Sequence, residues 1–133
     1  MDLLCLMPGA RQTLDTLRET YLLGIITNGD SELQRAKCSA LALAIEPIVI
    51  SGDYGFEKPD PRIFQKACSL AGVAQAESVY VGDRIDVDVA GARAAGMRAI
   101  WFSPLPRGDA IAINADGVIT RFDELPDVLR KLS

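Results

Sequence analysis

The sequence predicts an α/β protein with a doubly wound parallel sheet and helices on both faces, a three-layer α/β/α arrangement. Short apolar runs alternate along the chain with segments of helical pattern. The runs are nearly continuous rather than alternating, which is typical of strands buried on both faces. Capping residues and glycines bound the helical segments, so consecutive strands are expected to be joined by right-handed crossover helices.

Size and composition indicate a single globular domain. The 133 residues, 49% apolar and 24% charged, suffice for one core and argue against a disordered or fibrous protein. The net charge of −4 argues against a nucleic-acid partner. No apolar run approaches the ~20 residues of a membrane span. We therefore expect one domain over residues 1–133, with neither nucleic acid nor membrane among its partners.

The rarer residue types exclude several chemistries. The chain has no histidine, which excludes Ser-His-Asp triads, Cys-His dyads and HExxH zinc sites. Its three cysteines, Cys5, Cys38 and Cys68, are scattered and lack metal-binding spacing. Such cysteines are typical of buried thiols in a reducing compartment, so we expect a cytoplasmic protein.

Five strands are expected, each a short apolar run bounded by turn or cap residues. They cover residues 21–27, 47–51, 78–81, 98–102 and 117–120. The first is the clearest, with the sequence YLLGIIT, and the last is the shortest.

Five helices are expected around these strands. They cover residues 10–19, 32–43, 61–71, 86–95 and 124–132. Ser31 and Gln34 form a capping box for the second helix. Asp60 and Pro61 begin the third helix and Gly72 ends it, as Gly96 ends the fourth. The third helix has an apolar face made of Ile63, Phe64, Ala67 and Leu70.

The residues directly after each strand are the candidates for function, because ligands of such sheets bind beyond the carboxyl ends of the strands. Thr27, Asn28 and Gly29 follow the first strand and lead into a helix. A hydroxyl, an amide and backbone N–H groups there would form an oxyanion and phosphate cradle. The alternative is a plain turn in which Asp30 or Ser31 caps the helix.

Lys58 lies in the loop after the second strand, directly before Pro59. Proline restricts the residue before it to extended geometry, so the lysine backbone is held in place. A fixed ammonium can pair with carboxylates and a phosphoryl group together. The alternative is a solvated loop lysine.

Three acids, Asp83, Asp86 and Asp88, follow the third strand. Clustered carboxylates repel one another unless a cation or a lysine compensates, and oxygen ligands suit Mg²⁺. The alternative is that Asp83 or Asp86 caps a helix and the others are solvated. Because the three segments end at one edge of one sheet, they predict together a Mg²⁺ and phosphate site that needs no histidine.

The order and spacing of these segments resemble the haloacid dehalogenase (HAD) superfamily of phosphohydrolases and dehalogenases, whose core is Rossmann-like. Residues 24–29 (GIITNG) resemble its second motif and residues 58–64 (KPDPRIF) its third. Residues 81–88 (VGDRIDVD) resemble its GDxxxxD motif, and residues 122–129 its usual C-terminal end. The resemblance covers nearly the whole chain.

The resemblance implies roles for the first two segments. Thr27 would hydrogen-bond the transferring phosphoryl group, and Asn28 and Gly29 would line the same substrate pocket. Lys58 would neutralise the nucleophile and the phosphate.

The resemblance also implies that Asp83 is a Mg²⁺ ligand, directly or through water. Asp88 would orient Lys58 or the waters on the metal. Asp86 has no implied role and is expected at the surface or as a cap.

The first motif of the family, DxDGT or DxYGT after an apolar strand, has no counterpart. Asp2 has no strand before it, and Asp15 lies in a helical pattern. The chain therefore resembles the C-terminal core of a HAD protein, without the nucleophilic aspartate or the cap domain. We hypothesise that residues 3–7 form a strand beside 21–27, in the place of the missing motif. The rival hypothesis is that residues 1–7 are an extended tail and that a partner chain fills this place, through self-association or as a complementing chain.

The activity implied is Mg²⁺-dependent hydrolysis of a small phosphorylated metabolite through an aspartyl-phosphate. Without the nucleophile we expect negligible turnover from this chain alone. One alternative is an inactive fragment or pseudoenzyme that serves as a binding or interaction module. Dehalogenation of a 2-haloacid ranks last, because the acidic GDxxxxD segment suits phosphate better.

Overall fold

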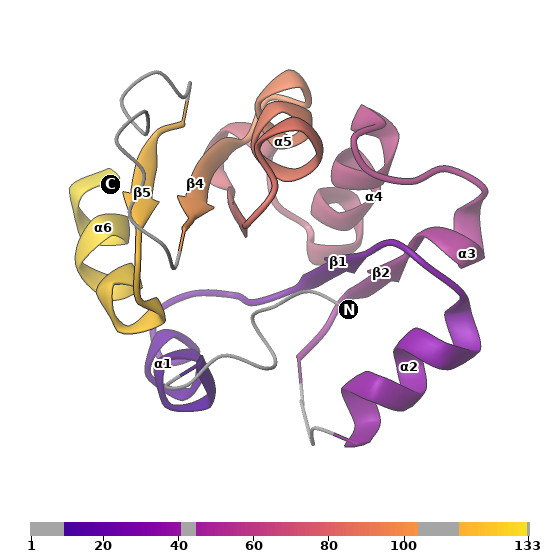
Figure 1. Ribbon diagram of the computed structural model, residues 1–133, viewed down its shortest axis with the longest axis horizontal. Coiled ribbons are helices and arrows are strands. Elements are labelled where there is room, and N and C mark those ends of the chain that lie inside the picture. Colours follow the sequence, from indigo (N-terminus) through magenta and orange to yellow (C-terminus); the bar gives the residue numbers. More distant parts are fainter. Residues whose placement is uncertain (1–9, 41–44, 104–114, 133) are drawn as a thin grey trace.

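The computed structural model describes residues 10–40, 45–103 and 115–132 of the chain (Figure 1). The elements are α1 (Ala10–Leu17), β1 (Ile25–Thr27), α2 (Ser31–Ala40), β2 (Ile48–Ile50), α3 (Ser51–Tyr54), α4 (Pro61–Ala71), β3 (Val79–Gly82), α5 (Ala90–Ala94), β4 (Arg98–Phe102), β5 (Gly117–Ile119) and α6 (Leu125–Leu132). Short 3₁₀ turns cover Gln75–Glu77 and Phe122–Glu124, and a π-helical turn covers Ile85–Val89.

All strand pairs of the described residues are parallel, which confirms the predicted α/β class. β1 pairs with β2, with Ile26 opposite Val49. β4 lies between β3 and β5, with Val81 opposite Ile100 on one side. Within the described ranges these pairs form two separate ladders. Residues 3–7, which we expected between β1 and β3, lie outside the described residues.

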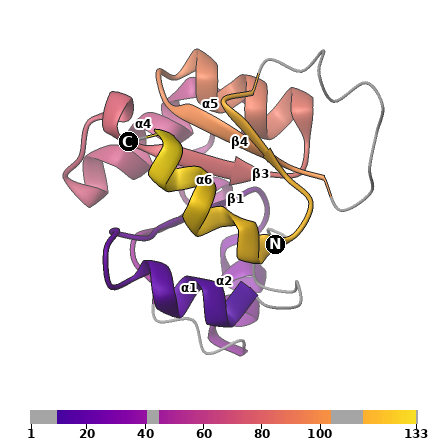
Figure 2. The same cartoon turned by 90° about the vertical axis from the view of Figure 1, so that its left-hand side faces the viewer.

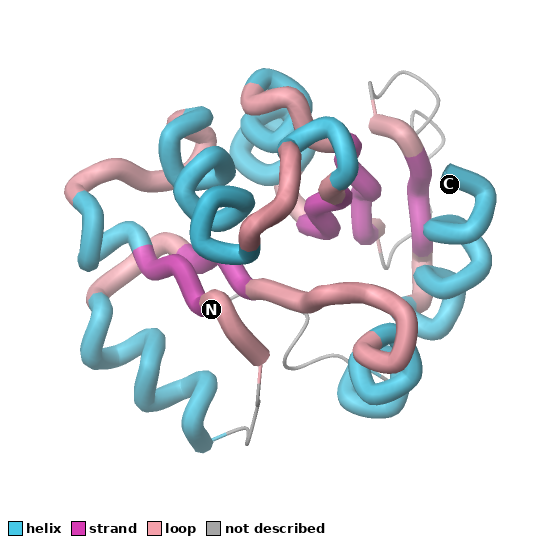
Figure 3. Tube along the Cα trace, turned by 180° about the vertical axis from the view of Figure 1, so that it is seen from behind, coloured by secondary structure: helices cyan, strands magenta, loops and turns pink. Residues whose placement is uncertain are grey.

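Helices cover the strands from two sides, so the molecule has three layers (Figures 1 and 2). The strand residues alternate between two apolar clusters: Ala99 and Trp101 of β4 pack with α4 and α5. Ile100 and Phe102 pack instead with α1 and α6. Seen from behind, the helices enclose the strands (Figure 3). This arrangement is the one the continuous apolar runs predicted.

The first strand is shorter than predicted. The N–H of Tyr21 donates to the carbonyl of Leu17 and closes the end of α1, so the strand begins only at Ile25. The apolar run 21–27 therefore spans a turn, a connection and a strand. Apolar character alone does not separate these states, because the side chain of Leu23 packs in the core from the connection.

The start of α2 also differs from the prediction. The carboxylate of Asp30 accepts a hydrogen bond from the N–H of Leu33 at 3.0 Å, which is the contact of an N-cap residue. Ser31 is the first helical residue, and the buried side chain of Gln34 faces Thr27 instead of completing a capping box. The described part of the helix ends at Ala40, so the predicted end at residue 43 lies outside the described residues.

Helix α4 follows its predicted signals. Asp60 accepts a hydrogen bond from the N–H of Arg62, and Gly72 ends the helix in left-handed geometry. The expectation that Leu70 belongs to the apolar inner face is wrong, because this residue is 50% exposed. Cys68 is buried instead, since it lies one turn beyond Phe64 on the inner face.

One further expectation is refined by the structure, and two short elements were not expected. The helix expected over 86–95 begins as the π-helical turn and continues as α5. Helix α3 and the turn at Gln75–Glu77 had no sequence signal that we recognised. No helix among the described residues is both long and apolar enough to cross a membrane.

Candidate functional site

The loops that follow β1 and β2 are tied together by one amide side chain. The Asn28 Oδ1 atom accepts a hydrogen bond from the backbone N–H of Lys58 at 2.9 Å. The Asn28 Nδ2 atom donates to the carbonyl of the same residue at 3.2 Å. Both ends of the amide are therefore committed to Lys58, and the lysine backbone is fixed by this clamp as well as by Pro59.

The side chain of Lys58 is buried and paired. Its Nζ atom donates to the Asp88 Oδ1 atom at 2.9 Å and to the Tyr80 hydroxyl at 2.9 Å. The two partners of the ion pair are only 5% and 4% exposed. The alternative of a solvated loop lysine is therefore wrong. Removing both charges from water is costly, so the pair depends on these close contacts.

Asp88 reaches the end of β3 because Gly82 leaves room for it. A Cβ atom on Gly82 would lie 2.3 Å from the Asp88 Cβ atom, which is a clash. The π-helical turn carries Asp88 back toward the strand, and its Oδ2 atom accepts a hydrogen bond from the N–H of Arg84 at 3.1 Å. Both oxygens of this carboxylate are thus engaged by the protein.

Asp83 lies beside this pair at the end of β3. Its carboxyl retains contact with solvent, and partial burial raises its pKa above the ordinary value. The negative charge of Asp88 raises the pKa further, whereas the Lys58 ammonium lowers it. The backbone carbonyl of Asp83 accepts a hydrogen bond from the indole of Trp101 at 3.0 Å, which anchors the loop.

Asp86, which has no implied role, lies at the surface. Its carboxylate is 3.6 Å from the guanidinium of Arg84, and both side chains are largely exposed. The structure therefore separates this acid from Asp83 and Asp88, as the sequence indicated.

Thr27 is buried at the end of β1, with 1% of its surface exposed. Its hydroxyl donates to the Gln34 Oε1 atom at 3.4 Å, a long hydrogen bond. The N–H of Gly29 donates to the Ser51 hydroxyl at 2.8 Å, so this group is not directed at a ligand. Of the predicted cradle, Asn28 and Gly29 thus serve to hold the loops together.

Three residues of the site were missed by the sequence analysis: Gln34, Tyr80 and Trp101. Each is a polar or amphipathic side chain inside an apolar segment or on the inner face of a helix. Tyr80 had a signal that could have identified it, since its hydroxyl sits in a strand that is otherwise apolar and needs a buried partner.

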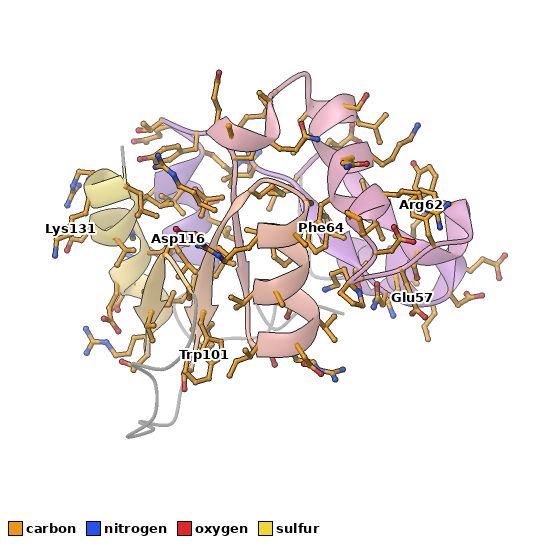
Figure 4. All side chains as sticks on the ribbon, turned by 90° about the horizontal axis from the view of Figure 1, so that it is seen from above. Glu57, Arg62, Phe64, Trp101, Asp116 and Lys131 are labelled. Carbon is orange, nitrogen blue, oxygen red and sulfur yellow. The ribbon has the colours of Figure 1, made fainter. Side chains whose placement is uncertain are left out.

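The structure thus brings together most of the predicted residues at the carboxyl edge of the parallel strands. Asn28 holds Lys58, Lys58 pairs with Asp88, and Asp83 lies within the electrostatic reach of both charges. Trp101 lies at the carboxyl end of β4 (Figure 4). Among the described residues, no group of three or more acids, cysteines or histidines is arranged to hold a metal ion.

The fold and this site define an α/β protein that gathers an ammonium and two carboxylates where its parallel strands end. Residues 1–96 match the family of haloacid dehalogenase-like hydrolases. The chain belongs to this haloacid dehalogenase-like hydrolase family.

Several characterised relatives are phosphatases. The glyceraldehyde 3-phosphate phosphatase of Pyrococcus furiosus is 38% identical over 134 residues, covering 94% of this chain and 55% of its own length. The phosphoserine phosphatase of Thermus thermophilus is 44% identical over 99 residues, covering 72% and 40% respectively. The chain therefore spans about half the length of the curated relatives it matches.

Solved structures of the same family share the fold. A HAD phosphatase from Thermococcus onnurineus superimposes with a TM-score of 0.84 at 36% identity, covering 92% of this chain and 57% of its own. A 2-haloacid dehalogenase from Pseudomonas syringae pv. Tomato superimposes with a TM-score of 0.79 at 37% identity, covering 95% and 54%.

Proposed function

We propose that this chain is the core portion of a Mg²⁺-dependent phosphatase that acts on a small phosphorylated metabolite. The observation that carries the proposal is the buried Lys58–Asp88 pair beside Asp83 at the carboxyl edge of the strands. A fixed positive charge next to carboxylates suits the binding of a phosphoryl group and a divalent cation together. Phosphatases among the relatives support this choice over dehalogenation.

Thr27 and Lys58 are the residues proposed to contact the phosphoryl group. The ammonium would neutralise negative charge on the phosphoryl oxygens, and its burial strengthens that interaction by lowering the local dielectric. The Thr27 hydroxyl would donate a hydrogen bond to the same group. Asn28 contributes by clamping the Lys58 backbone, and Asp88 by holding the ammonium.

The residues present fit a magnesium ion. Mg²⁺ keeps several waters and takes one or two protein carboxylates, so a cluster of three acids is not required. Partial burial, and then the nearby charge of Asp88, raise the pKa of Asp83, and a bound cation would offset both effects. Asp83 would therefore hold the ion, and Asp88, whose two oxygens already accept hydrogen bonds from Lys58 and Arg84, would orient the waters on it. When bound, the ion would offset charge on the phosphoryl group.

The nucleophile must come from elsewhere, because the 133 residues contain no counterpart of the DxDGT motif. We propose that it is supplied by a longer gene product or by a complementing chain, in the cytoplasm. The phosphatases named above act on different small phosphate monoesters, so the substrate class, and no single compound, is proposed.

The second candidate function is a binding module without turnover. The missing nucleophile motif is the observation that favours it, since Thr27, Lys58 and Asp83 could still bind phosphate or Mg²⁺.

The test uses the single tryptophan of the chain as a reporter. Trp101 donates to the backbone of Asp83, so its fluorescence should change when Mg²⁺ and inorganic phosphate are added. We expect Asp83→Asn and Lys58→Met to weaken this response by about tenfold or more. Asp86→Asn is the control, because this exposed acid is paired only with Arg84 at the surface.

Hydrolysis of p-nitrophenyl phosphate by the same samples separates the two functions. The proposal predicts ligand binding with negligible turnover by this chain alone, and turnover once a segment carrying the DxDGT motif is present. An in-frame motif directly upstream of Met1 would identify that segment. If the unaltered chain binds neither Mg²⁺ nor phosphate, both functions are rejected.

A further inference from the structure

We propose that Tyr80 is a positioning residue, whose hydroxyl holds the Lys58 ammonium in place and links it to the strand that carries Thr27. The consequence for phosphate binding rests on the proposed function. The contact itself does not, so the two can be tested separately.

The hydrogen bonds of the Tyr80 hydroxyl have a fixed direction. The hydroxyl lies 3.2 Å from the carbonyl oxygen of Ile26 and 2.9 Å from the Lys58 Nζ atom. A carbonyl oxygen can only accept and an ammonium can only donate. The hydroxyl proton therefore points to Ile26, and an oxygen lone pair faces Lys58. A hydroxyl satisfies both neighbours at once, because it donates one hydrogen bond and accepts another.

Packing fixes the ring that carries this hydroxyl. Tyr80 is buried, with 9% of its surface exposed. Its ring meets the Phe64 ring edge-on, with centroids 5.2 Å apart and planes at 86°. Phe64 lies in the interior between α4 and α5 (Figure 4). The Lys58 ammonium is 5.4 Å from the centre of the Tyr80 ring, so the ring itself also attracts the charge.

Two acceptors from different elements hold the ammonium better than one. The ion pair with Asp88 holds the ammonium from one element, and the Tyr80 hydroxyl adds an acceptor from a second element. Tyr80 approaches from β3 and Asp88 from the turn that follows it, and the two contacts together define where the charge lies. Pre-organised charge of this kind is what stabilises a transferring phosphoryl group.

The same hydroxyl connects the two strand ladders at the site. Ile26 directly precedes Thr27 in β1, and Tyr80 belongs to β3. Among the described residues these strands share no ladder, so the bond from Tyr80 to the Ile26 carbonyl is a direct polar link between them. The Tyr80 hydroxyl thus links the Thr27 strand to the Lys58 ammonium, in addition to the Asn28 clamp on the Lys58 backbone.

The first test observes the lysine ammonium groups by NMR after ¹⁵N labelling of lysine. The chain has four lysines, Lys37, Lys58, Lys66 and Lys131, and loss of a signal in Lys58→Met assigns the Lys58 signal. In Tyr80→Phe we expect the protons of the Lys58 ammonium to exchange with solvent about tenfold faster, because one hydrogen bond to a charged group is lost. An unchanged Lys58 signal in a folded Tyr80→Phe protein would overturn the proposal.

The matched control is Tyr54→Phe. The Tyr54 ring stacks on Phe56 with centroids 5.9 Å apart, and loss of its hydroxyl should leave the Lys58 signal unchanged. If Tyr80→Phe does not fold, a measurement on the unaltered protein tests the proposal instead. A slowly exchanging Tyr80 hydroxyl proton, with cross-relaxation to Lys58, is expected, and its absence would overturn the proposal.

Titration with inorganic phosphate and Mg²⁺ then tests the consequence. Tyr80→Phe should weaken phosphate binding about tenfold, the cost of one hydrogen bond to a charged group, while Tyr54→Phe should not change it. A changed Lys58 signal together with no phosphate binding by the unaltered chain would uphold the positioning contact and reject the proposed function. Unchanged phosphate affinity in Tyr80→Phe would reject positioning for phosphate.

Discussion

Lys58 and Asp88 depend on each other because both are removed from water. An ammonium buried without a counter-charge costs several kcal/mol, so the pair is stable only as a unit. Gly82 makes the approach possible, and the hydroxyl of Tyr80 is a further acceptor for the ammonium. The stability of the fold and the proposed function therefore depend on the same contacts.

Asp88→Asn is expected to lower the free energy of unfolding by about 3 kcal/mol, because Lys58 would keep its charge in a buried place with a neutral partner. Urea denaturation at pH 7 measures this change. Asp86→Asn is the matched control and should change the same quantity by less than about 0.5 kcal/mol, since its pair with Arg84 is exposed. Equal effects of both variants would contradict the interpretation of a buried pair.

The carboxylate of Asp116 links the start of β4 to the start of β5, away from the Lys58 site. Burial by itself would raise the pKa of this acid. The hydrogen bonds from the N–H of Ala99 and from Arg93, with the charges of Arg93 and Arg98, lower it below the usual value. The contact distances are 2.8 Å to the Ala99 nitrogen and 2.7 Å to the Arg93 guanidinium. Asp116 lies beside β5 (Figure 4).

A lowered folded-state pKa means that the unfolded chain binds the proton more readily. The stabilisation by Asp116 is therefore full above the unfolded pKa of about 3.9 and is lost as the pH falls through the lower folded value. Asp116→Asn should cost about 1 kcal/mol at pH 7, after allowance for its partial exposure. The cost should shrink as the pH falls below about 4 and through the folded-state pKa. Urea midpoints across this pH range check the slope, and a cost independent of pH would contradict the prediction.

At the scale of elements, the close approach of α4 and α5 holds the residues that pack next to the Lys58 site. A Cβ atom on Gly91 would lie 2.9 Å from the Phe64 ring and 3.0 Å from the Pro59 Cα atom. Pro59 directly follows Lys58, and Phe64 packs against Tyr80. The absence of a side chain at this glycine therefore lets the helix approach both the lysine loop and the ring that holds the ammonium.

Gly91→Ala should lower the free energy of unfolding by about 1–3 kcal/mol, even though alanine is the better helix former. The physical reason is overpacking against Phe64 and Pro59. Thermal or urea unfolding measures the change. Ala94→Gly, at an exposed position of the same helix, is the control for helix propensity alone and should cost about 1 kcal/mol. A stabilised Gly91→Ala protein would show that the two segments pack less closely.

At the scale of the whole molecule, the described strands form one ladder of two and one of three. The two ladders share an apolar cluster that includes Ile26, Val49 and Tyr80. They also share the Tyr80 hydrogen bond, but among the described residues they share no backbone pairing. Backbone hydrogen bonds in a short two-stranded ladder open more easily than those of a central strand.

Native-state hydrogen exchange tests the strand hypothesised for residues 3–7. A strand beside β1, whether from residues 3–7 or from a complementing chain, would pair β1 on both sides, as β4 is paired. We then expect the amides of β1 to exchange about as slowly as those of β4. Mass spectrometry or NMR of the exchanging amides measures this. Exchange of the β1 amides at least about tenfold faster than that of the β4 amides would contradict the hypothesis.

The parallel α/β class and most elements were predictable from the sequence. The reason is that they depend on local chemistry: continuous apolar runs indicate buried strands, and Asp60, Pro61 and Gly72 mark the ends of α4. The alignment of Lys58 with the acids after β3 was also predictable, because parallel strands place their carboxyl ends at one edge.

What the tertiary structure alone decided is which polar groups pair with which. Apolar runs do not show where a strand begins, so β1 is shorter than its run. Asn28 and Gly29 were predicted to face a ligand, but long-range contacts direct them to the Lys58 backbone and to Ser51. Tyr80 meets Ile26, 54 residues away in the chain, only because packing brings β3 and β1 together. Such partners are set by side-chain packing across the fold, which no local pattern in the sequence encodes.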